Sequence, residues 1–157
     1  MKTLEITGRQ EVESILHACR LCFVGLADTD GTPYVIPMNF GYRDGTAYLH
    51  SAQTGRSIDI AGRNPKVCLA FNDGEELVYQ HPQVACSYRM RSRSVIAWGE
   101  VEFITDFEQK KEALDILMAH YSGESFHYAR PAVENVKIWR VRLDRVTARA
   151  FGAPHEK

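Results

Sequence analysis

The sequence predicts a mainly β fold, an antiparallel barrel or strongly curled sheet with peripheral helices. Six or more short strand-like segments follow one another at hairpin spacing, and only three helical patterns separate them. No glycine-rich dinucleotide fingerprint follows any predicted strand, which disfavours a parallel doubly wound sheet. With 157 residues and 45% hydrophobic composition, we expect a single domain over residues 1–157 with a substantial core.

The chain opens with a predicted helix over residues 8–20. Thr7 and Gln10 have the spacing of a capping box at its start. The apolar residues that follow recur at the period of one helix face: Val12, Ile15, Leu16 and Cys19.

A meander of three strands should follow the first helix. Segments 21–27 and 34–40 flank a turn rich in Asp, Gly and Pro, so they are expected to form a hairpin. A second tight turn at 42–45 leads into a strand over 46–51, which should pair with the strand before it.

A short helix is predicted to interrupt the sheet. Thr54 is a candidate cap for a helix over 54–63, which must end by Asn64 because Pro65 disfavours helical geometry in the residue before it. Strand 66–72 then resumes the sheet, and residues 73–76 should form a turn.

The C-terminal half is expected to contain two strands and one helix. After an ambiguous stretch at 77–90, segment 94–104 is predicted to be a long strand with a bulge at Gly99. A helix should begin at Thr105, and alternation over 137–149 predicts a final strand with one wet face. The apolar stripe of the helix would be Phe107, Leu114, Leu117, Met118 and Tyr121.

Composition narrows the function classes. A net charge of −1, from 19 basic and 20 acidic residues, gives no overall field that would attract nucleic acid or anionic lipid. The first 20 residues carry no apolar signal core and no membrane span, so a cytoplasmic location is expected.

The four cysteines raise the question of a metal or redox site. Cys19 and Cys22 have Cys-x-x-Cys spacing, but Cys68 and Cys86 do not repeat it. Because Cys19, Cys22 and Cys68 lie among apolar neighbours, we interpret the thiols as buried and reduced, and no metal site is predicted.

The start of the short helix is the best local anion site. The sequence "TGRS" combines free backbone N–H groups at a helix N-terminus with the hydroxyls of Thr54 and Ser57 and the guanidinium of Arg56. A phosphate would fit there. The alternative is that Thr54 only caps the helix and Arg56 is only a solvated charge.

Three arginines at period two form a second basic cluster. Arg89, Arg91 and Arg93 would lie on one face of a strand, where like charges repel unless something negative lies against them. The alternative is an edge strand that uses positive charge to discourage aggregation. Nucleic acid is disfavoured because interleaved aromatic residues are missing.

Pro37 and Asn39 interrupt the strand at 34–40. Proline cannot donate to a β ladder, so this strand could direct its carbonyl and N–H groups at a flat polar heterocycle instead. The alternative is an edge strand bonded to water. His50 lies on the next strand. A lone histidine is more often structural than catalytic, but beside a redox cofactor His50 would be a candidate proton donor.

Together these segments resemble a known family. The blocks "YVIPMNFGY" (34–42), "AYLHSAQTGRSIDIAGRNPKVCLAF" (47–71) and "RSVIAWGEVEFI" (93–104) are similar to the pyridoxamine 5′-phosphate oxidase-like flavin-binding split barrels. Within that family they resemble the branch related to 5-nitroimidazole resistance proteins. The similarity covers residues 4–105 well and the remainder loosely.

The resemblance implies a homodimeric, antiparallel split β-barrel with FMN at the subunit interface. By family pattern, the isoalloxazine edge would meet the backbone of Ile36, Pro37, Met38 and Asn39. His50 and Ser51 would lie beside the ring or ribityl chain, and the phosphate would meet Thr54, Arg56 and Ser57. Arg93 and Ser94 would complete the flavin pocket.

The resemblance also predicts an activity. We expect an FMN-dependent oxidoreductase that passes electrons from NAD(P)H to a small acceptor such as a nitroaromatic compound, with His50 at most an accessory acid. Oxidation of vitamin B6 is not expected, because Asn39 replaces a basic residue and "WRVRLDRVTARAFG" lacks most of the Arg-rich C-terminal pattern. The alternative is a flavin- or haem-binding protein without turnover.

Overall fold

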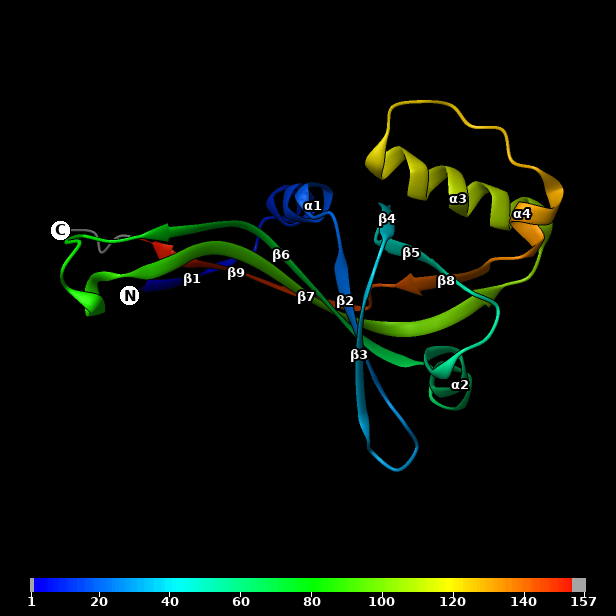
Figure 1. The fold of residues 1–157 in the computed structure, drawn as a ribbon, viewed down its shortest axis with the longest axis horizontal. Coiled ribbons are helices and arrows are strands. Elements are labelled where there is room, and N and C mark those ends of the chain that lie inside the picture. Colours follow the sequence, from blue (N-terminus) through cyan, green and yellow to red (C-terminus); the bar gives the residue numbers. More distant parts are fainter. Residues whose placement is uncertain (1, 154–157) are drawn as a thin grey trace.

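A computed structural model describes residues 2–153 and shows a mainly antiparallel, nine-stranded sheet with a few helices (Figure 1). The strands are β1 (Lys2–Ile6), β2 (Cys22–Ala27), β3 (Pro33–Met38), β4 (Phe40–Arg43), β5 (Thr46–Ser51), β6 (Lys66–Val78), β7 (Arg89–Ile104), β8 (Lys137–Arg142) and β9 (Arg145–Ala153). The helices are α1 (Arg9–Ala18), α2 (Arg56–Arg63), α3 (Phe107–Tyr121) and α4 (Arg130–Glu134), with one 3-10 turn, η1 (Ala85–Ser87). No helix within the described residues is long and apolar enough to cross a membrane.

The topology is that of a split barrel. Hydrogen-bonded neighbours follow the order β3-β2-β6-β7-β8-β5-β4, with β9 pairing β7 and β1 pairing β9. β3 and β4 follow each other in the chain, yet they lie at opposite ends of this path. The predicted strand 34–40 is therefore divided at Asn39: its first part pairs with β2, and its last residue starts β4, which pairs with β5.

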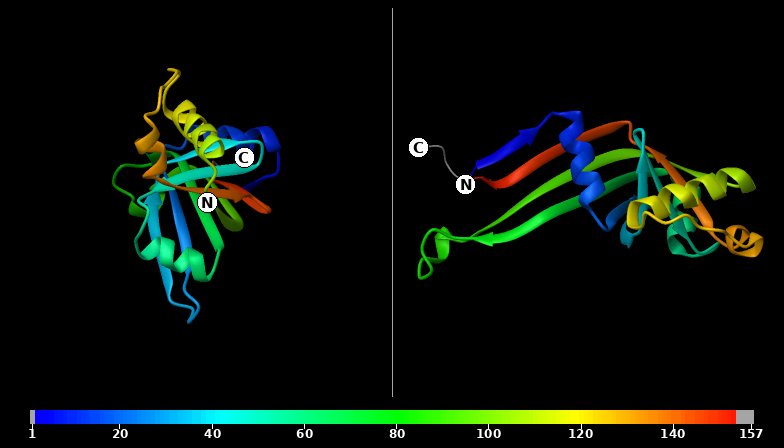
Figure 2. Two further views of the ribbon diagram at one scale, coloured as in Figure 1. Left: turned by 90° about the vertical axis from the view of Figure 1, so that its right-hand side faces the viewer. Right: turned by 90° about the horizontal axis from the view of Figure 1, so that it is seen from above.

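One long hairpin extends the sheet away from the barrel. β6 and β7 pair from Lys66 and Glu100 out to Val78 and Arg89, and β9 and β1 lie alongside (Figure 2). Residues 73–76 do not form the expected turn, because β6 continues through them with a register shift between Asp73 and Glu76. Residues 73–76, which have the composition of a turn, form a β-bulge in β6 instead.

The core lies inside the curl of the sheet. Trp139, Phe40 and Phe71 are its largest buried side chains, with at most 1% of their surface exposed. α1 closes one side with the buried Ile15 and Leu16, as its apolar spacing predicts. Burying these side chains supplies the main stabilising free energy of the fold.

Gly99 is not a bulge, because β6 and β7 pair in unbroken register across it. It marks the residue where β7 changes partners: β7 pairs with β9 up to Trp98 and with β8 from Val101. A Cβ on Gly99 would collide with the carbonyl oxygen of Arg142 in β8. Glycine is needed here for close backbone approach.

The final strand predicted over 137–149 is in fact two strands. β8 and β9 are interrupted at Leu143 and Asp144, whose N–H groups donate to the carbonyl oxygens of Gly45 and Trp98. The chain passes from one half of the barrel to the other at this break. β1 was not predicted, since its few residues show only a short alternation.

Two predicted helix starts are wrong. The N-cap of α1 is Gly8 rather than Thr7, and no side chain bonds the free N–H groups there. α3 begins at Phe107 rather than at Thr105, because Asp106 is its N-cap and accepts a hydrogen bond from the N–H of Gln109 at 2.9 Å.

α3 buries a different stripe from the predicted one. Lys110, Ala113, Ile116 and Leu117 are its buried residues, and only Leu117 was expected. The helix packs on β4 so closely that a Cβ on Gly41 would lie 2.7 Å from the carbonyl oxygen of Ile116. The small residue that permits this close contact is Gly41 on β4.

Candidate functional site

The rim predicted at Ile36–Asn39 lies on an edge strand. β3 pairs only with β2, and its other side has no strand partner among the described residues. Pro37 opposes Phe23 and is exposed, whereas Met38 is buried. An edge tolerates proline because one side of the strand has no ladder to complete. Unpaired backbone groups of the edge remain for another partner.

The N-terminus of α2 meets this edge. Its N-cap is Gly55, whose positive φ of 143° (ψ 168°) is a conformation that favours glycine. The predicted cap Thr54 is therefore wrong, and no side chain bonds the first N–H groups. A Cβ at Gly55 would find open space. Arg56, the first helical residue, places its guanidinium 5.1 Å from the centre of the Tyr34 ring on β3.

This end of α2 has the properties of an anion site. The helix is anchored by the buried Ile60 and Ala61, and it ends at Asn64 as predicted. Its uncapped N–H groups carry the positive end of the helix dipole, and the Arg56 charge adds to it. Ser57 is half-buried within the same first turn.

The end of β5 leads into α2 and carries the next two predicted residues. Ser51 Oγ accepts a hydrogen bond from Trp139 Nε1 at 2.9 Å and donates to the carbonyl oxygen of Ala52 at 2.9 Å. The Ser51 hydroxyl therefore already has two partners.

His50 lies opposite Ile138 in the β5–β8 pair and is exposed in the single chain. Burial of its ring against the neighbouring elements nevertheless lowers the pKa of His50. A lowered pKa favours the neutral imidazole at pH 7.

The three arginines of β7 have partners within the chain. Arg93 forms an ion pair with Asp73 at 2.5 Å, Arg91 pairs with Glu76, and Arg89 donates to the carbonyl oxygen of Gly152 at 3.1 Å. The acidic residues of β6 thus remove the expected repulsion. The alternative of a charged edge strand is wrong for Arg93, because β7 pairs with both β6 and β9 there. It stands for Arg89 and Arg91, which pair with β6 alone, since the pairing with β9 begins at Ser92.

The structure does not bring all predicted residues together in one chain. β3, the end of β5 and the start of α2 are neighbours, through chain continuity and the contact of Arg56 with Tyr34. Arg93 and Ser94 lie on β7, which β2 and β6 separate from β3. Three strand spacings correspond to about 14 Å.

The outer face of the sheet carries an apolar surface that sequence reasoning missed. Phe23 is 48% exposed and Val35 is 62% exposed, and they lie on the same face as Pro37. Ile96 and Trp98 continue this face on β7, where Arg145 stacks on the Trp98 ring at 3.8 Å. We call Phe23, Val35, Ile96 and Trp98 the outer face. Large apolar residues at alternating positions facing away from the core were the available signal.

Comparison with known proteins agrees with this fold. The model of the pyridoxamine 5′-phosphate oxidase family matches residues 8–150. The chain therefore belongs to that family, a class of flavin-binding split barrels. None of the curated protein sequences matches the chain.

Several solved structures are similar. A "putative 5-nitroimidazole antibiotic resistance protein" from Bacteroides thetaiotaomicron is 50% identical, with a TM-score of 0.86 over 95% of this chain and 87% of the other. The flavocytochrome Anf3 from Azotobacter vinelandii is 22% identical, with a TM-score of 0.78 over 96% and 71% of the two chains. The FAD and haem binding protein from Mycobacterium smegmatis is 18% identical, with a TM-score of 0.82 over 98% and 76%. The last two show similarity of fold.

Proposed function

We propose that this protein is an FMN-dependent oxidoreductase that transfers electrons from NAD(P)H to a small acceptor such as a nitroaromatic compound. The observation that carries the proposal is the uncapped N-terminus of α2, with Arg56 beside the open edge of β3. A helix start of this kind binds phosphate, and an unpaired strand edge offers hydrogen bonds to a flat heterocycle.

The residues present fit FMN. The phosphate would meet the N–H groups after Gly55, the guanidinium of Arg56 and the hydroxyl of Ser57, where Gly55 leaves open space. The edge of β3 at Ile36–Asn39 would orient the ring system. Bound FMN would supply the redox chemistry, and the chain's part is to bind it, orient it and limit access of water.

His50 acts in this proposal through its neutral form. Because burial lowers its pKa, His50 is expected to be uncharged near pH 7 and to hold a hydrogen bond to the cofactor or substrate. This favours a polar contact over the accessory acid expected from the sequence.

We propose that the active form is a homodimer with the flavin at its interface. The outer face, on which Phe23 and Val35 are the most exposed residues, is a suitable contact surface for a second copy. The separation between β3 and β7 supports the same arrangement. Arg93 and Ser94 of one subunit would then lie near the flavin held by the other.

The relative from Bacteroides supports the choice of acceptor. That protein is named for resistance to 5-nitroimidazole antibiotics, and half of its aligned residues are the same as here. Reduction of the nitro group is a chemistry that a flavin with one open face can perform. Oxidation of pyridoxamine phosphate is not proposed, because this chain has Asn39 at the rim.

A second candidate function is flavin or haem binding without turnover. The similarity in fold to a flavocytochrome and to an FAD and haem binding protein favours it, since one fold can serve several cofactors. In this case the chain would carry or store its cofactor.

The visible spectrum of protein purified without added cofactor tests the proposal. A yellow protein with flavin bands, or saturable uptake of FMN by colourless protein, is expected. A Soret band would indicate haem instead. Oxidation of NADPH or NADH that depends on added metronidazole would separate the enzyme from the binding protein. A chain that takes up no FMN in titration contradicts the proposal.

A further inference from the structure

One side chain holds the loop between β5 and α2. The β5–β8 ladder ends at the pair of Ser51 and Lys137, and residues 52–55 belong to no helix or strand. Beyond that pair, Gln53 Nε2 donates to the carbonyl oxygens of Glu134 at 2.7 Å and of Val136 at 3.0 Å. Within the described residues, no other hydrogen bond ties this loop to a distant part of the chain.

The two ends of α2 are anchored differently. At the C-terminal end, Asn64 Nδ2 donates to the carbonyl oxygen of Ala27 at 2.9 Å. Arg63 at the same end pairs with Asp28 at 2.7 Å. At the N-terminal end, the hydrogen bonds to other elements come from Gln53, two residues before the N-cap. The position of the first turn of α2 therefore depends on Gln53.

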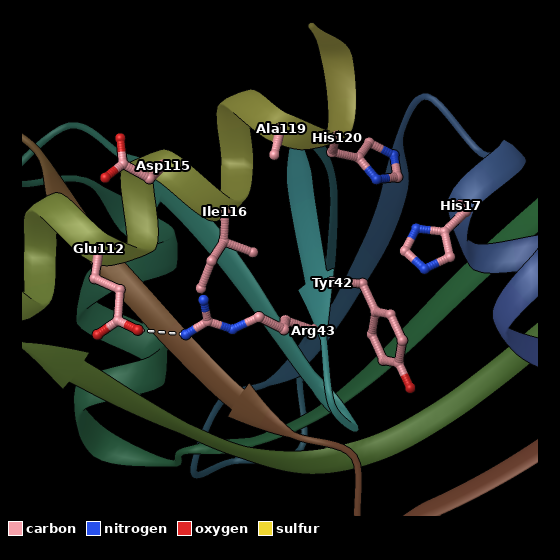
Figure 3. A pocket seen from close by; sticks show the side chains of 8 residues that line it. All are labelled: His17, Tyr42, Arg43, Glu112, Asp115, Ile116, Ala119 and His120. Atoms are coloured by element: carbon pink, nitrogen blue, oxygen red, sulfur yellow. Dashed lines mark hydrogen bonds and ion pairs between the residues drawn. The ribbon is translucent and has the colours of Figure 1, made fainter. Parts of the chain in front are cut away.

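The carbonyl group of Glu134 is in turn fixed by α3. Lys110, which is buried on α3, donates to the same oxygen through its Nζ at 3.2 Å. A buried ammonium group needs such a partner, and a carbonyl oxygen can accept two hydrogen bonds. The ion pair of Glu112 with Arg43 joins α3 to β4 (Figure 3). The loop before α2 is thus tied, through Glu134, to a helix that is itself held on the sheet.

We propose that Gln53 is a positioning residue that makes the start of α2 select phosphorylated over unphosphorylated flavin, an inference that rests on the proposed function. Its two hydrogen bonds fix the N-cap Gly55 and the direction in which Arg56 and the first N–H groups point. Donors that are already ordered bind phosphate without a further loss of conformational entropy. Both amide donors of Gln53 are used by carbonyl groups, so Gln53 acts through α2 and not on the phosphate itself.

Gln53→Met tests this inference, because methionine has nearly the same length but cannot donate a hydrogen bond. Flavin fluorescence titration of the full chain measures the affinities for FMN and for riboflavin. The preference for FMN over riboflavin should fall about fivefold, the effect expected for one neutral hydrogen bond. The riboflavin affinity should hardly change, because riboflavin has no phosphate. Gln10→Met is the matched control, since Gln10 is an exposed glutamine on α1.

Inorganic phosphate provides a second test that needs no flavin. Titration with phosphate should shift the NMR amide signals of Arg56 and Ser57 in the wild-type chain. Gln53→Met should weaken this binding about fivefold, for the same reason as above. Gln10→Met should leave it unchanged.

Amide exchange with deuterium tests the anchoring itself. The N–H of Asp59 donates to the carbonyl oxygen of Gly55 at 3.0 Å, so its exchange reports on the first turn of α2. The N–H of Asn64 donates to the carbonyl oxygen of Ile60 at 2.8 Å and reports on the last turn. Gln53→Met should speed exchange at the first of these amides and leave the second unchanged.

The inference is overturned if Gln53→Met keeps the wild-type preference for FMN, or if it weakens the binding of both flavins equally, as a general loosening of the fold would. Equal exchange of the Asp59 amide in wild type and variant would also overturn it. A chain that takes up no FMN, but binds inorganic phosphate in a way that depends on Gln53, would support this inference and contradict only the proposed function. A chain that binds neither would overturn both.

Discussion

Replacing Arg56 by Ala tests the proposed phosphate site directly. Arg56 is the first residue of α2, and its guanidinium lies over the Tyr34 ring at 5.1 Å. This contact holds the charge beside the free N–H groups of the helix. Removing the side chain should leave those N–H groups in place and abolish only the charge-assisted hydrogen bond to phosphate.

The expected loss follows from that difference. A hydrogen bond to a charged group contributes about 1.5–3 kcal/mol, which corresponds to a loss of about 10- to 150-fold in FMN affinity. The contact with Tyr34 is at an exposed site, so its removal should change the free energy of unfolding by only about 0.5–1 kcal/mol. The variant should therefore remain folded.

Flavin fluorescence titration measures the effect with two ligands that differ only in the phosphate. Arg56→Ala should weaken FMN binding by the stated factor and leave riboflavin binding nearly unchanged, so the preference for FMN over riboflavin should fall by the same factor. Arg63→Ala is the matched control. Arg63 lies on the same helix, but at its other end, where it pairs with Asp28 at 2.7 Å.

Two outcomes would refute the reasoning. If Arg56→Ala retains the wild-type preference for FMN, Arg56 does not bind the phosphate. If Arg56→Ala and Arg63→Ala lower FMN affinity equally, the effect comes from the general charge or stability of α2 and not from its N-terminus.

Three further predictions concern the fold. Gly99→Ala should lower the free energy of unfolding, measured in urea, by about 3 kcal/mol, because the new Cβ would meet the carbonyl oxygen of Arg142 on β8. Gly62→Ala is the control: no atom lies within 4 Å of its Cβ, so it should raise the free energy of unfolding by about 0.5–1 kcal/mol. Equal effects of the two substitutions would contradict the close approach of β8 to Gly99. The hydrogen bond from the guanidinium of Arg63, at the C-terminus of α2, lowers the pKa of Asp28 from 3.8 to about 2. The ionised Asp28 therefore stabilises the folded state at pH values above its unfolded pKa, and this stabilisation is lost as the pH falls from about 4 towards 2. Asp28→Asn should reduce the fall in thermal midpoint over that range, and an unchanged acid profile would count against the pairing. Iodoacetamide should modify the exposed Cys86 first, as followed by mass spectrometry. Cys19 is buried and its pKa is raised to about 11, so it should react only in urea. Equal rates of modification in the native protein would contradict the burial of Cys19.

Much of the architecture was predictable from local patterns. Apolar spacing located α1 and α3, the segment between Thr54 and Pro65 located α2, and turn residues separated β2 from β3 and β4 from β5. The reduced state of the cysteines also agrees with the expectation, since all four are free. Cys19 and Cys22 are buried as expected, whereas Cys68 is only half-buried and Cys86 is exposed.

The errors arose where tertiary contacts override local preference. Gly99 fits the local pattern of a bulge, and only the approach of β8 explains its presence. Residues 73–76 have turn composition, but pairing with β7 keeps them in β6. The predicted α3 stripe was wrong because the side of the helix that packs on the sheet is set by tertiary contacts: Gly41 on β4 lets the backbone of Ile116 and Leu117 approach closely, and these two residues are buried.

The candidate site was predictable in part for the same reason. The start of α2 and the edge at Pro37 are local features of the chain, and the structure places them together through the contact of Arg56 with Tyr34. The pairing of Arg93 with Asp73 depends on the register of β6 and β7, which no local pattern of β7 reveals. The apolar outer face similarly appears only once the inward side of each strand is known.

The change of pairing partners along β7 affects how the protein unfolds. Its first half belongs to the sheet that contains β2, β6 and β9, and its second half belongs to the sheet that contains β5 and β8. The continuous backbone of β7 therefore belongs to both halves of the barrel. Loss of the β-sheet hydrogen bonds in one half would disturb β7, and with it the pairing in the other half. Amide protons of β5 and of β2 should exchange with deuterium through the same global event, so that the barrel behaves as one cooperative unit although its wall is split.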